Sequence, residues 1–90
     1  PETKEKPGLG SDHTYAKVAI VDPELMLSVP KKITAATGFD VLAHSIEAYT
    51  SNQATPITDK MAEEAIRLTG KYLRRAVENG NDMEARTAMA

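Results

Sequence analysis

Residues 56–78, PITDKMAEEAIRLTGKYLRRAVE, carry the strongest periodicity of this chain. Apolar side chains recur at steps of four, three, four and four, which puts them on one face of an α-helix. Thr55 can cap this helix and Pro56 suits its first position. The pattern predicts a helix over 56–78 whose apolar stripe contacts a core or a partner helix. The stripe consists of Met61, Ala65, Leu68, Tyr72 and Ala76, and Ile66, Leu73 and Val77 widen it.

The residues after this helix contain a stop signal and a second start signal. Asn79-Gly80 is typical of a helix end. Asn81, with Glu84 three residues later, resembles a capping box, and it predicts a last helix from Met83 to Ala90.

Before residue 56 the pattern is also helical but is interrupted. From Pro30 on, residues between Ile33 and Tyr49 lie near helical spacing. Gly38 costs about 1 kcal/mol relative to alanine inside a helix, so it indicates a close backbone approach or a break. We expect a short helix near 31–36 and a firm helix from about 38 to 50.

The N-terminal third has different signals. Residues 1–14 are rich in proline, glycine and charge and predict a loop. The β-branched run in 16–22 predicts a buried strand, which Pro23 closes. Residues 23–30 lie between two prolines and allow one helical turn. The expected fold is therefore mainly α, with a short β segment at the N-terminal end.

Composition excludes several classes of function. The 90 residues include 11 Lys and Arg, 13 Asp and Glu and no cysteine. The net charge of −2 argues against a nucleic-acid partner, and the lack of cysteine excludes disulfides and thiolate sites. No apolar run is long enough to cross a membrane. We expect a cytoplasmic protein, of which this sequence is one piece, since it lacks an initiator Met and has only four aromatic residues.

Asp40 and His44 are the most informative polar pair. Their spacing places both side chains on one helix face, where oxygen and imidazole ligands can bind a divalent metal. Glu47 shares the face and could lie in an outer shell. A bare D-x-x-x-H is also common as a solvated pair, and two ligands are too few for a catalytic site. His13, the other histidine, lies in a loop without ligand-like spacing and is expected to be exposed.

The middle of the chain resembles the iron-containing (group III) alcohol dehydrogenase family. The ordered pattern includes Asp22, Pro30, Gly38, Asp40 and Glu47. The resemblance covers nearly the whole chain, through AIVDPEL (19–25), VP (29–30), TAATGFDVLAHSIEAY (34–49), PITD (56–59), AI (65–66) and EAR (84–86).

The resemblance implies an α/β Rossmann-like N-terminal domain and an all-helical C-terminal domain in the parent protein. Residues 1–29 would end the dinucleotide-binding domain and 30–90 would begin the metal-binding domain. Asp40 and His44 would be two of the four metal ligands, for Fe²⁺ or Zn²⁺, with two later histidines beyond this sequence. Lys6, Leu25 and Ser28 would contact NAD or NADP, although the family often has glycine at the position of Ser28.

The implied function is an NAD(P)-dependent alcohol dehydrogenase that interconverts alcohols and aldehydes or ketones. Its partners would be small-molecule substrates, and the parent would be a homo-oligomer, while the isolated piece would be inactive. GFDVL (38–42), YT (49–50) and KYLRRAV (71–77) are also similar to hydroxyacid–oxoacid transhydrogenases, a branch of the same family. A non-catalytic helical interaction module is the alternative from another class.

Overall fold

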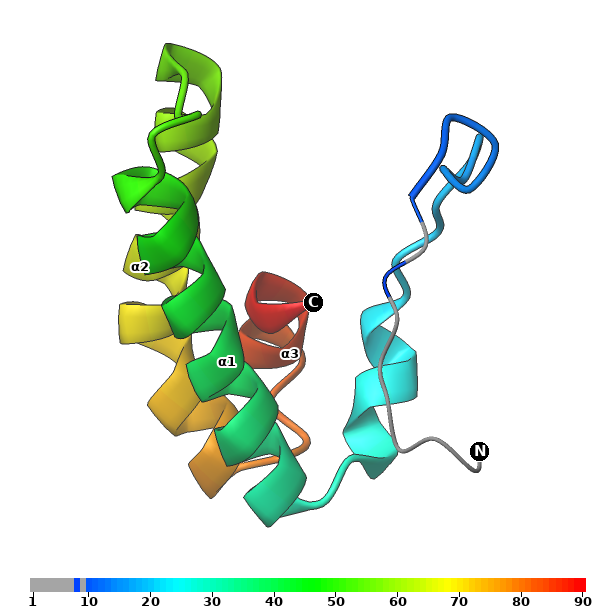
Figure 1. The fold of residues 1–90 in the computed structure, drawn as a ribbon. Helices are drawn as coiled ribbons and strands as arrows, with labels where there is room; N and C mark the ends of the chain where they lie inside the picture. Colours follow the sequence, from blue (N-terminus) through cyan, green and yellow to red (C-terminus); the bar gives the residue numbers. More distant parts are fainter. Residues whose placement is uncertain (1–7, 9) are drawn as a thin grey trace, which may run out of the picture.

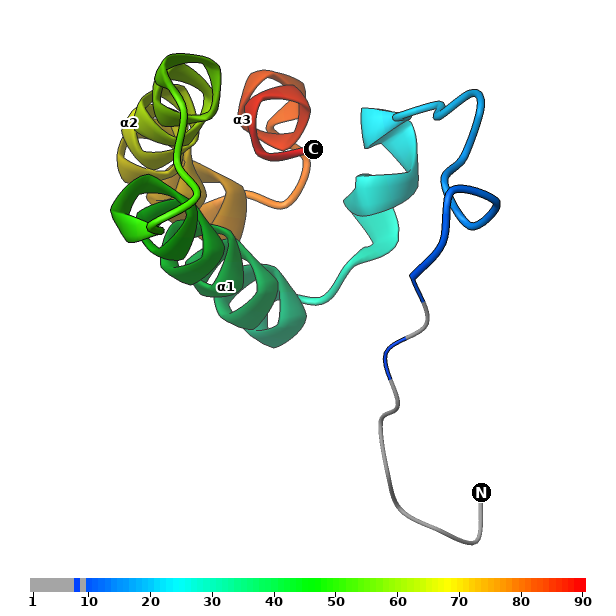
Figure 2. The same cartoon turned by 45° about the horizontal axis from the view of Figure 1, so that its top comes forward.

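The computed structural model describes Gly8 and residues 10–90, which form three α-helices and one 3₁₀ helix (Figure 1). The elements are η1 (Pro23–Ser28), α1 (Lys31–Thr50), α2 (Pro56–Glu78) and α3 (Met83–Met89). Helices α1 and α2 form an antiparallel pair, and α3 lies between this pair and η1 (Figure 2). Within the described residues, none of the helices combines the length and apolar character that a membrane span requires.

Helix α2 confirms the strongest prediction, with both of its ends where the sequence signals place them. Thr55 and Thr58 form a reciprocal capping box: the Thr55 backbone N–H donates to Thr58 Oγ1 at 2.7 Å, and the Thr58 backbone N–H donates to Thr55 Oγ1 at 3.2 Å. Pro56 occupies the first turn, where its missing N–H costs nothing. Local capping chemistry therefore fixes where the second long helix starts.

Helix α1 is continuous, so the predicted break near Gly38 is wrong. Gly38 instead marks a close approach, because the Leu73 side chain of α2 packs directly on its backbone. A Cβ at Gly38 would overlap Leu73 Cδ1 and lie 3.3 Å from Leu73 Cγ. The buried face of α1 consists of small side chains, Thr34, Gly38 and Ser45, while Ile33 and Tyr49 remain about half exposed. Close packing of the two helices explains the glycine.

The core lies where the C-terminal half of α2 meets α3. Tyr72, Ala76 and Ala85 are buried together, with Leu68 and Met89 packed against them. The stripe predicted on α2 is therefore core at its C-terminal end. At the N-terminal end Met61 is 68% exposed, since no described element covers it.

Helix α3 (Met83–Met89) confirms the last helix predicted from Met83, but Asp82 caps it, so the predicted capping box at Asn81 is wrong. The Asp82 carboxylate accepts the Ala85 backbone N–H at 3.0 Å. Glu84 accepts hydrogen bonds from Tyr72 Oη (2.9 Å) and Arg75 Nη2 (2.7 Å). Arg75 also bonds Asp82, so tertiary contacts with α2 hold the capped end of α3 in place.

The predicted buried strand over residues 16–22 is not observed: the described residues contain no strand, and Val18 and Ile20 are 78% and 88% exposed. A strand needs a neighbour to satisfy its backbone groups, and the described residues offer none. The predicted helical turn is confirmed as η1, which Asp22 caps by accepting the Glu24 N–H at 2.9 Å.

Replacing Gly38 with alanine should destabilise the protein, although alanine favours helices. Overpacking against Leu73 costs about 1–3 kcal/mol and outweighs a propensity gain of about 1 kcal/mol. The control is Gly70→Ala in α2, where a Cβ meets nothing within 4 Å, and which should raise the free energy of unfolding. Denaturant unfolding checks the pair. Equal stabilisation by both changes would contradict the packing described.

The free energy of unfolding should also fall in acid, because the carboxylates of Asp82 and Glu84 that join α2 to α3 become protonated. The Ala85 N–H and then Arg75 lower the pKa of Asp82, and Arg75 and then Tyr72 lower the pKa of Glu84. Lowered pKa values in the folded state stabilise it above the ordinary carboxyl range of about 4, and this stability is lost as pH falls through the folded values.

Melting temperature against pH, from about pH 7 to pH 3, tests this linkage. Arg75→Gln should flatten the acid limb of the curve, because part of the lowering disappears. Arg74→Gln removes the same charge from the neighbouring position and should leave the limb unchanged. The same slope in both variants and the wild type would refute the assignment.

Candidate metal-binding site

Helix α1 holds Asp40 and His44 one turn apart, as the sequence predicts. His44 Nε2 lies 3.8 Å from Asp40 Oδ1, and the two side chains are 74% and 68% exposed. The packing of Gly38 on Leu73 immediately before them fixes this part of α1 against α2. The pair is therefore accessible on a rigid element.

The separation of the two donor atoms fits coordination of one ion. Two bonds of about 2.1 Å at a tetrahedral angle separate their donor atoms by about 3.4 Å, so a small side-chain rotation from the 3.8 Å seen here would bring both to one ion. A carboxylate oxygen and an imidazole nitrogen are donors that suit iron and zinc. The two residues thus supply two compatible ligands.

A complete site is not present in the part of the chain that the structure describes. No group of three or more His, Asp, Glu or Cys side chains gathers there. Within residues 10–90, the Glu47 side chain forms no hydrogen bond or ion pair with Asp40 or His44. His13 is exposed in a turn, which confirms that expectation. The described pair therefore offers two candidate donors, fewer than a catalytic metal site needs.

The predicted cofactor contacts lie on or before η1. Leu25 is 73% exposed and Ser28 is exposed, with its hydroxyl donating to the Leu25 carbonyl at 3.4 Å. Lys6 lies outside the described residues. Both described positions therefore present side chains to solvent from one short helix.

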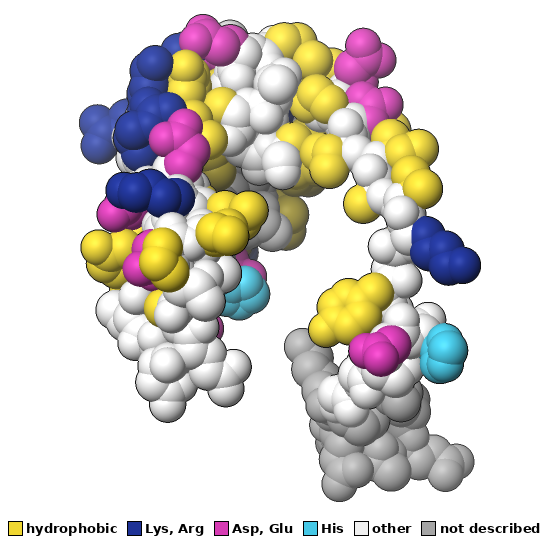
Figure 3. Space-filling model, turned by 90° about the horizontal axis from the view of Figure 1, so that it is seen from above, with side chains coloured by type: hydrophobic (Ala, Val, Ile, Leu, Met, Phe, Trp, Pro, Cys, Tyr) yellow, Lys and Arg dark blue, Asp and Glu magenta, His cyan; other side chains and the backbone are white. Residues whose placement is uncertain are grey.

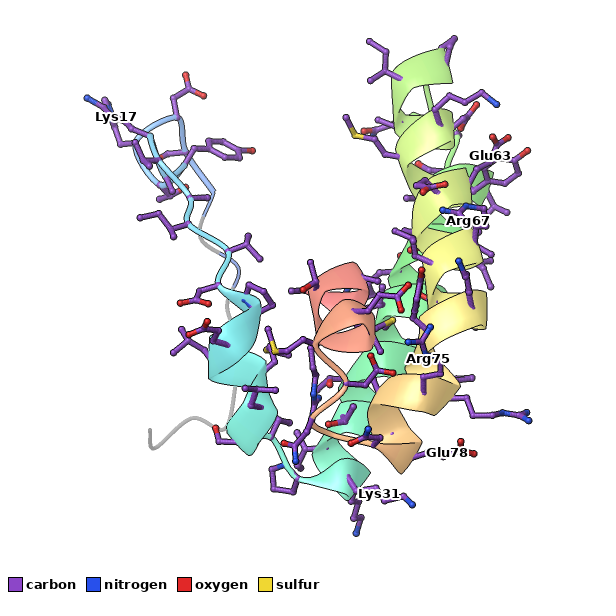
Figure 4. All side chains as sticks on the ribbon, turned by 180° about the vertical axis from the view of Figure 1, so that it is seen from behind. Lys17, Lys31, Glu63, Arg67, Arg75 and Glu78 are labelled. Carbon is purple, nitrogen blue, oxygen red and sulfur yellow. The ribbon has the colours of Figure 1, made fainter. Side chains whose placement is uncertain are left out.

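The charged surface of α2 is mostly paired. Lys and Arg side chains gather on the outer side of the helical bundle with acidic side chains between them (Figure 3). Glu63 and Arg67 lie one turn apart on α2, and Arg75 lies about two turns further along the helix (Figure 4). Lys60 bonds Glu63 at 2.6 Å and Arg67 bonds Glu64 at 2.5 Å. These pairs lie on the solvent-exposed side of α2.

Arg86 is 2% exposed, although no pattern in the sequence predicts its burial or its role. Its guanidinium bonds Gly80 O (2.8 Å), Thr34 Oγ1 (2.9 Å) and Val29 O (3.2 Å). A single basic residue among the apolar side chains of α3 was the available signal.

An exposed Asp–His pair one turn apart on a helix is compatible with metal binding, but the same spacing also occurs in solvated pairs. A model of the C-terminal domain of the Fe-containing alcohol dehydrogenase family matches residues 34–90. The chain belongs to this family, and the resemblance noted from the sequence is confirmed.

Individual relatives agree with this assignment. The chain is 54% identical over 79 residues to long-chain-alcohol dehydrogenase 1 of Geobacillus thermodenitrificans, covering 88% of this chain and 20% of the relative. It is 58% identical over 73 residues to NAD-dependent methanol dehydrogenase of Bacillus methanolicus, covering 81% and 19%. A crystal structure of 1,3-propanediol oxidoreductase matches with a TM-score of 0.75 and 51% identity, covering 77% of this chain and 18% of that chain. The chain spans about a fifth of these relatives.

Loss of either ligand should remove bound metal from the protein that carries this segment. Asp40→Asn and His44→Ala should each lower iron or zinc affinity by more than about 100-fold, because losing even an outer-shell partner costs about 10–100-fold. Elemental analysis after dialysis against a metal buffer measures the content. Asp12→Asn and His13→Ala are matched controls that should keep the metal. Full occupancy in both test variants would exclude the pair as ligands.

Proposed function

We propose that the protein containing this sequence is an NAD(P)-dependent, metal-dependent alcohol dehydrogenase, an oxidoreductase that interconverts alcohols and aldehydes or ketones. The observation that carries the proposal is the Asp40–His44 pair, with donor atoms 3.8 Å apart on an exposed helix face within the segment that matches the family. The names of the relatives, which act on alcohols and include an NAD-dependent enzyme, support the same chemistry.

Asp40 and His44 would hold a divalent ion, Fe²⁺ or Zn²⁺, together with ligands from outside the described residues. When bound, such an ion supplies Lewis-acid polarisation of the alcohol oxygen. Asp40 would contribute a single negative charge and His44 would bind as the neutral imidazole. With one carboxylate and otherwise neutral ligands, the site would keep a net positive charge, which would favour loss of the alcohol proton.

The junction before α1 would supply cofactor contacts. We assign residues 1–29 to the end of a dinucleotide-binding domain and 30–90 to the start of the helical metal domain. The change from irregular chain and η1 to long helices at Pro30 supports this boundary. Leu25 and Ser28, together with Lys6, would orient NAD or NADP for hydride transfer, since the cofactor itself carries the redox chemistry.

A hydroxyacid–oxoacid transhydrogenase is the second candidate. The chain is 37% identical over 107 aligned positions to the mitochondrial enzyme of that name from Xenopus tropicalis, covering 98% of this chain and 23% of the relative. The two candidates differ in how the reduced cofactor is used. A dehydrogenase releases it, whereas a transhydrogenase reoxidises it with an oxoacid.

One assay on the purified, metal-loaded protein separates these candidates. We expect primary alcohols with NAD⁺ or NADP⁺ to give free NAD(P)H, which is detected by its absorbance. His44→Ala should abolish this reaction. Turnover of a hydroxyacid with an oxoacid, without added nucleotide, would instead identify the transhydrogenase. If neither reaction occurs with Fe²⁺ or Zn²⁺, the proposal is wrong and a helical interaction module is favoured.

A further inference from the structure

Arg86 connects three segments that are far apart in the sequence. Its Nε donates to Gly80 O in the α2–α3 loop at 2.8 Å. Its Nη1 donates to Thr34 Oγ1 in the first turns of α1 at 2.9 Å, and its Nη2 donates to Val29 O at the end of η1 at 3.2 Å. Because the residue is only 2% exposed, water does not compete for these bonds.

The acceptors of Arg86 are neutral. Among residues 10–90, the structure gives Arg86 no carboxylate partner. Directional hydrogen bonds to neutral oxygens therefore hold the guanidinium, in place of an ion pair. The planar fork of arginine can reach three acceptors in fixed directions, whereas a lysine ammonium on a flexible stem cannot reproduce that pattern. A buried cation without these acceptors would be strongly destabilising.

Two of the acceptors lie on either side of Pro30, the joint between η1 and α1. Thr34 Oγ1 also lies 3.4 Å from Val29 O, which closes a small triangle of bonds around the joint. Met26 of η1 and Met89 of α3 line the same small cavity beside Arg86. The direction in which η1 leaves α1 is therefore set from α3.

We propose that Arg86 is a positioning residue that orients η1, with Leu25 and Ser28, relative to the Asp40–His44 pair on α1. This inference rests on the proposed function for the roles of those four residues. Within residues 10–90, the hydrogen bonds of Arg86 go to Gly80, Thr34 and Val29 and not to Asp40, His44, Leu25 or Ser28. Its effect acts through Val29 and Thr34, so its loss should disturb cofactor alignment while leaving the metal in place.

The test uses the full-length, metal-loaded protein with Arg86→Gln and, in case that variant folds poorly, Thr34→Val. A misplacement of about 1 Å near the reacting groups can cost about 100-fold in rate. We expect kcat/KM for the nicotinamide cofactor to fall by about 100-fold in Arg86→Gln, mainly through KM, and by less in Thr34→Val. The metal content should match the wild type.

The matched control is Arg75→Gln, which also detaches an arginine from the α2–α3 region but touches neither Val29 nor Thr34. Assays are run below the melting temperature of every variant. A purely structural role would lower melting temperature in both arginine variants and leave the cofactor KM equal between them. Equal KM values for Arg86→Gln and Arg75→Gln, with an active wild type, overturn the inference.

Hydrogen exchange separates this inference from the proposed function. Amides of residues 23–34 should exchange faster in Arg86→Gln than in Arg75→Gln, whatever the protein catalyses. If the wild type neither binds NAD(P)H nor oxidises alcohols, the proposed function fails. Unchanged exchange in residues 23–34 of Arg86→Gln would show that Arg86 does not hold the joint at Pro30. Faster exchange with an unaltered cofactor KM would overturn the positioning role alone.

Discussion

The buried guanidinium of Arg86 is the constraint on which the arrangement of this segment depends. Three neutral acceptors from the end of η1, the start of α1 and the α2–α3 loop surround one cation. Removing any acceptor leaves charge or donors unsatisfied in a place that water does not reach, and such defects cost more than an ordinary hydrogen bond contributes. The segment therefore has one arrangement in which all of these groups are satisfied.

A second constraint acts between the two long helices. Gly38 lets Leu73 approach the α1 backbone, and Thr34 and Ser45 extend the same face with small side chains. Protein interiors transmit displacements because they are closely packed. Since Asp40 and His44 follow Gly38 on the same rigid helix, the spacing of α1 and α2 also sets where the metal pair stands.

Features encoded by neighbouring residues could be predicted from the sequence, and features that need distant partners could not. Thr55 and Pro56 start α2 through local capping, and the spacing of Asp40 and His44 is a property of any helix. The strand expected over 16–22 would need another strand, and Glu84, expected in the cap of α3, instead bonds Tyr72 and Arg75 of α2. The role of Arg86 depends on acceptors up to 57 residues away, which periodicity does not reveal.

That 57-residue separation also bears on the order of folding. Contacts within the α1–α2 pair span shorter stretches of chain, such as the 35 residues from Gly38 to Leu73, so their loop-closure entropy is smaller. Val29 emerges from the ribosome long before Arg86, at synthesis rates of about 5–20 residues per second. Seconds therefore pass between the synthesis of the joint at Pro30 and that of Arg86. Until α3 has been translated, η1 remains free to sample other orientations.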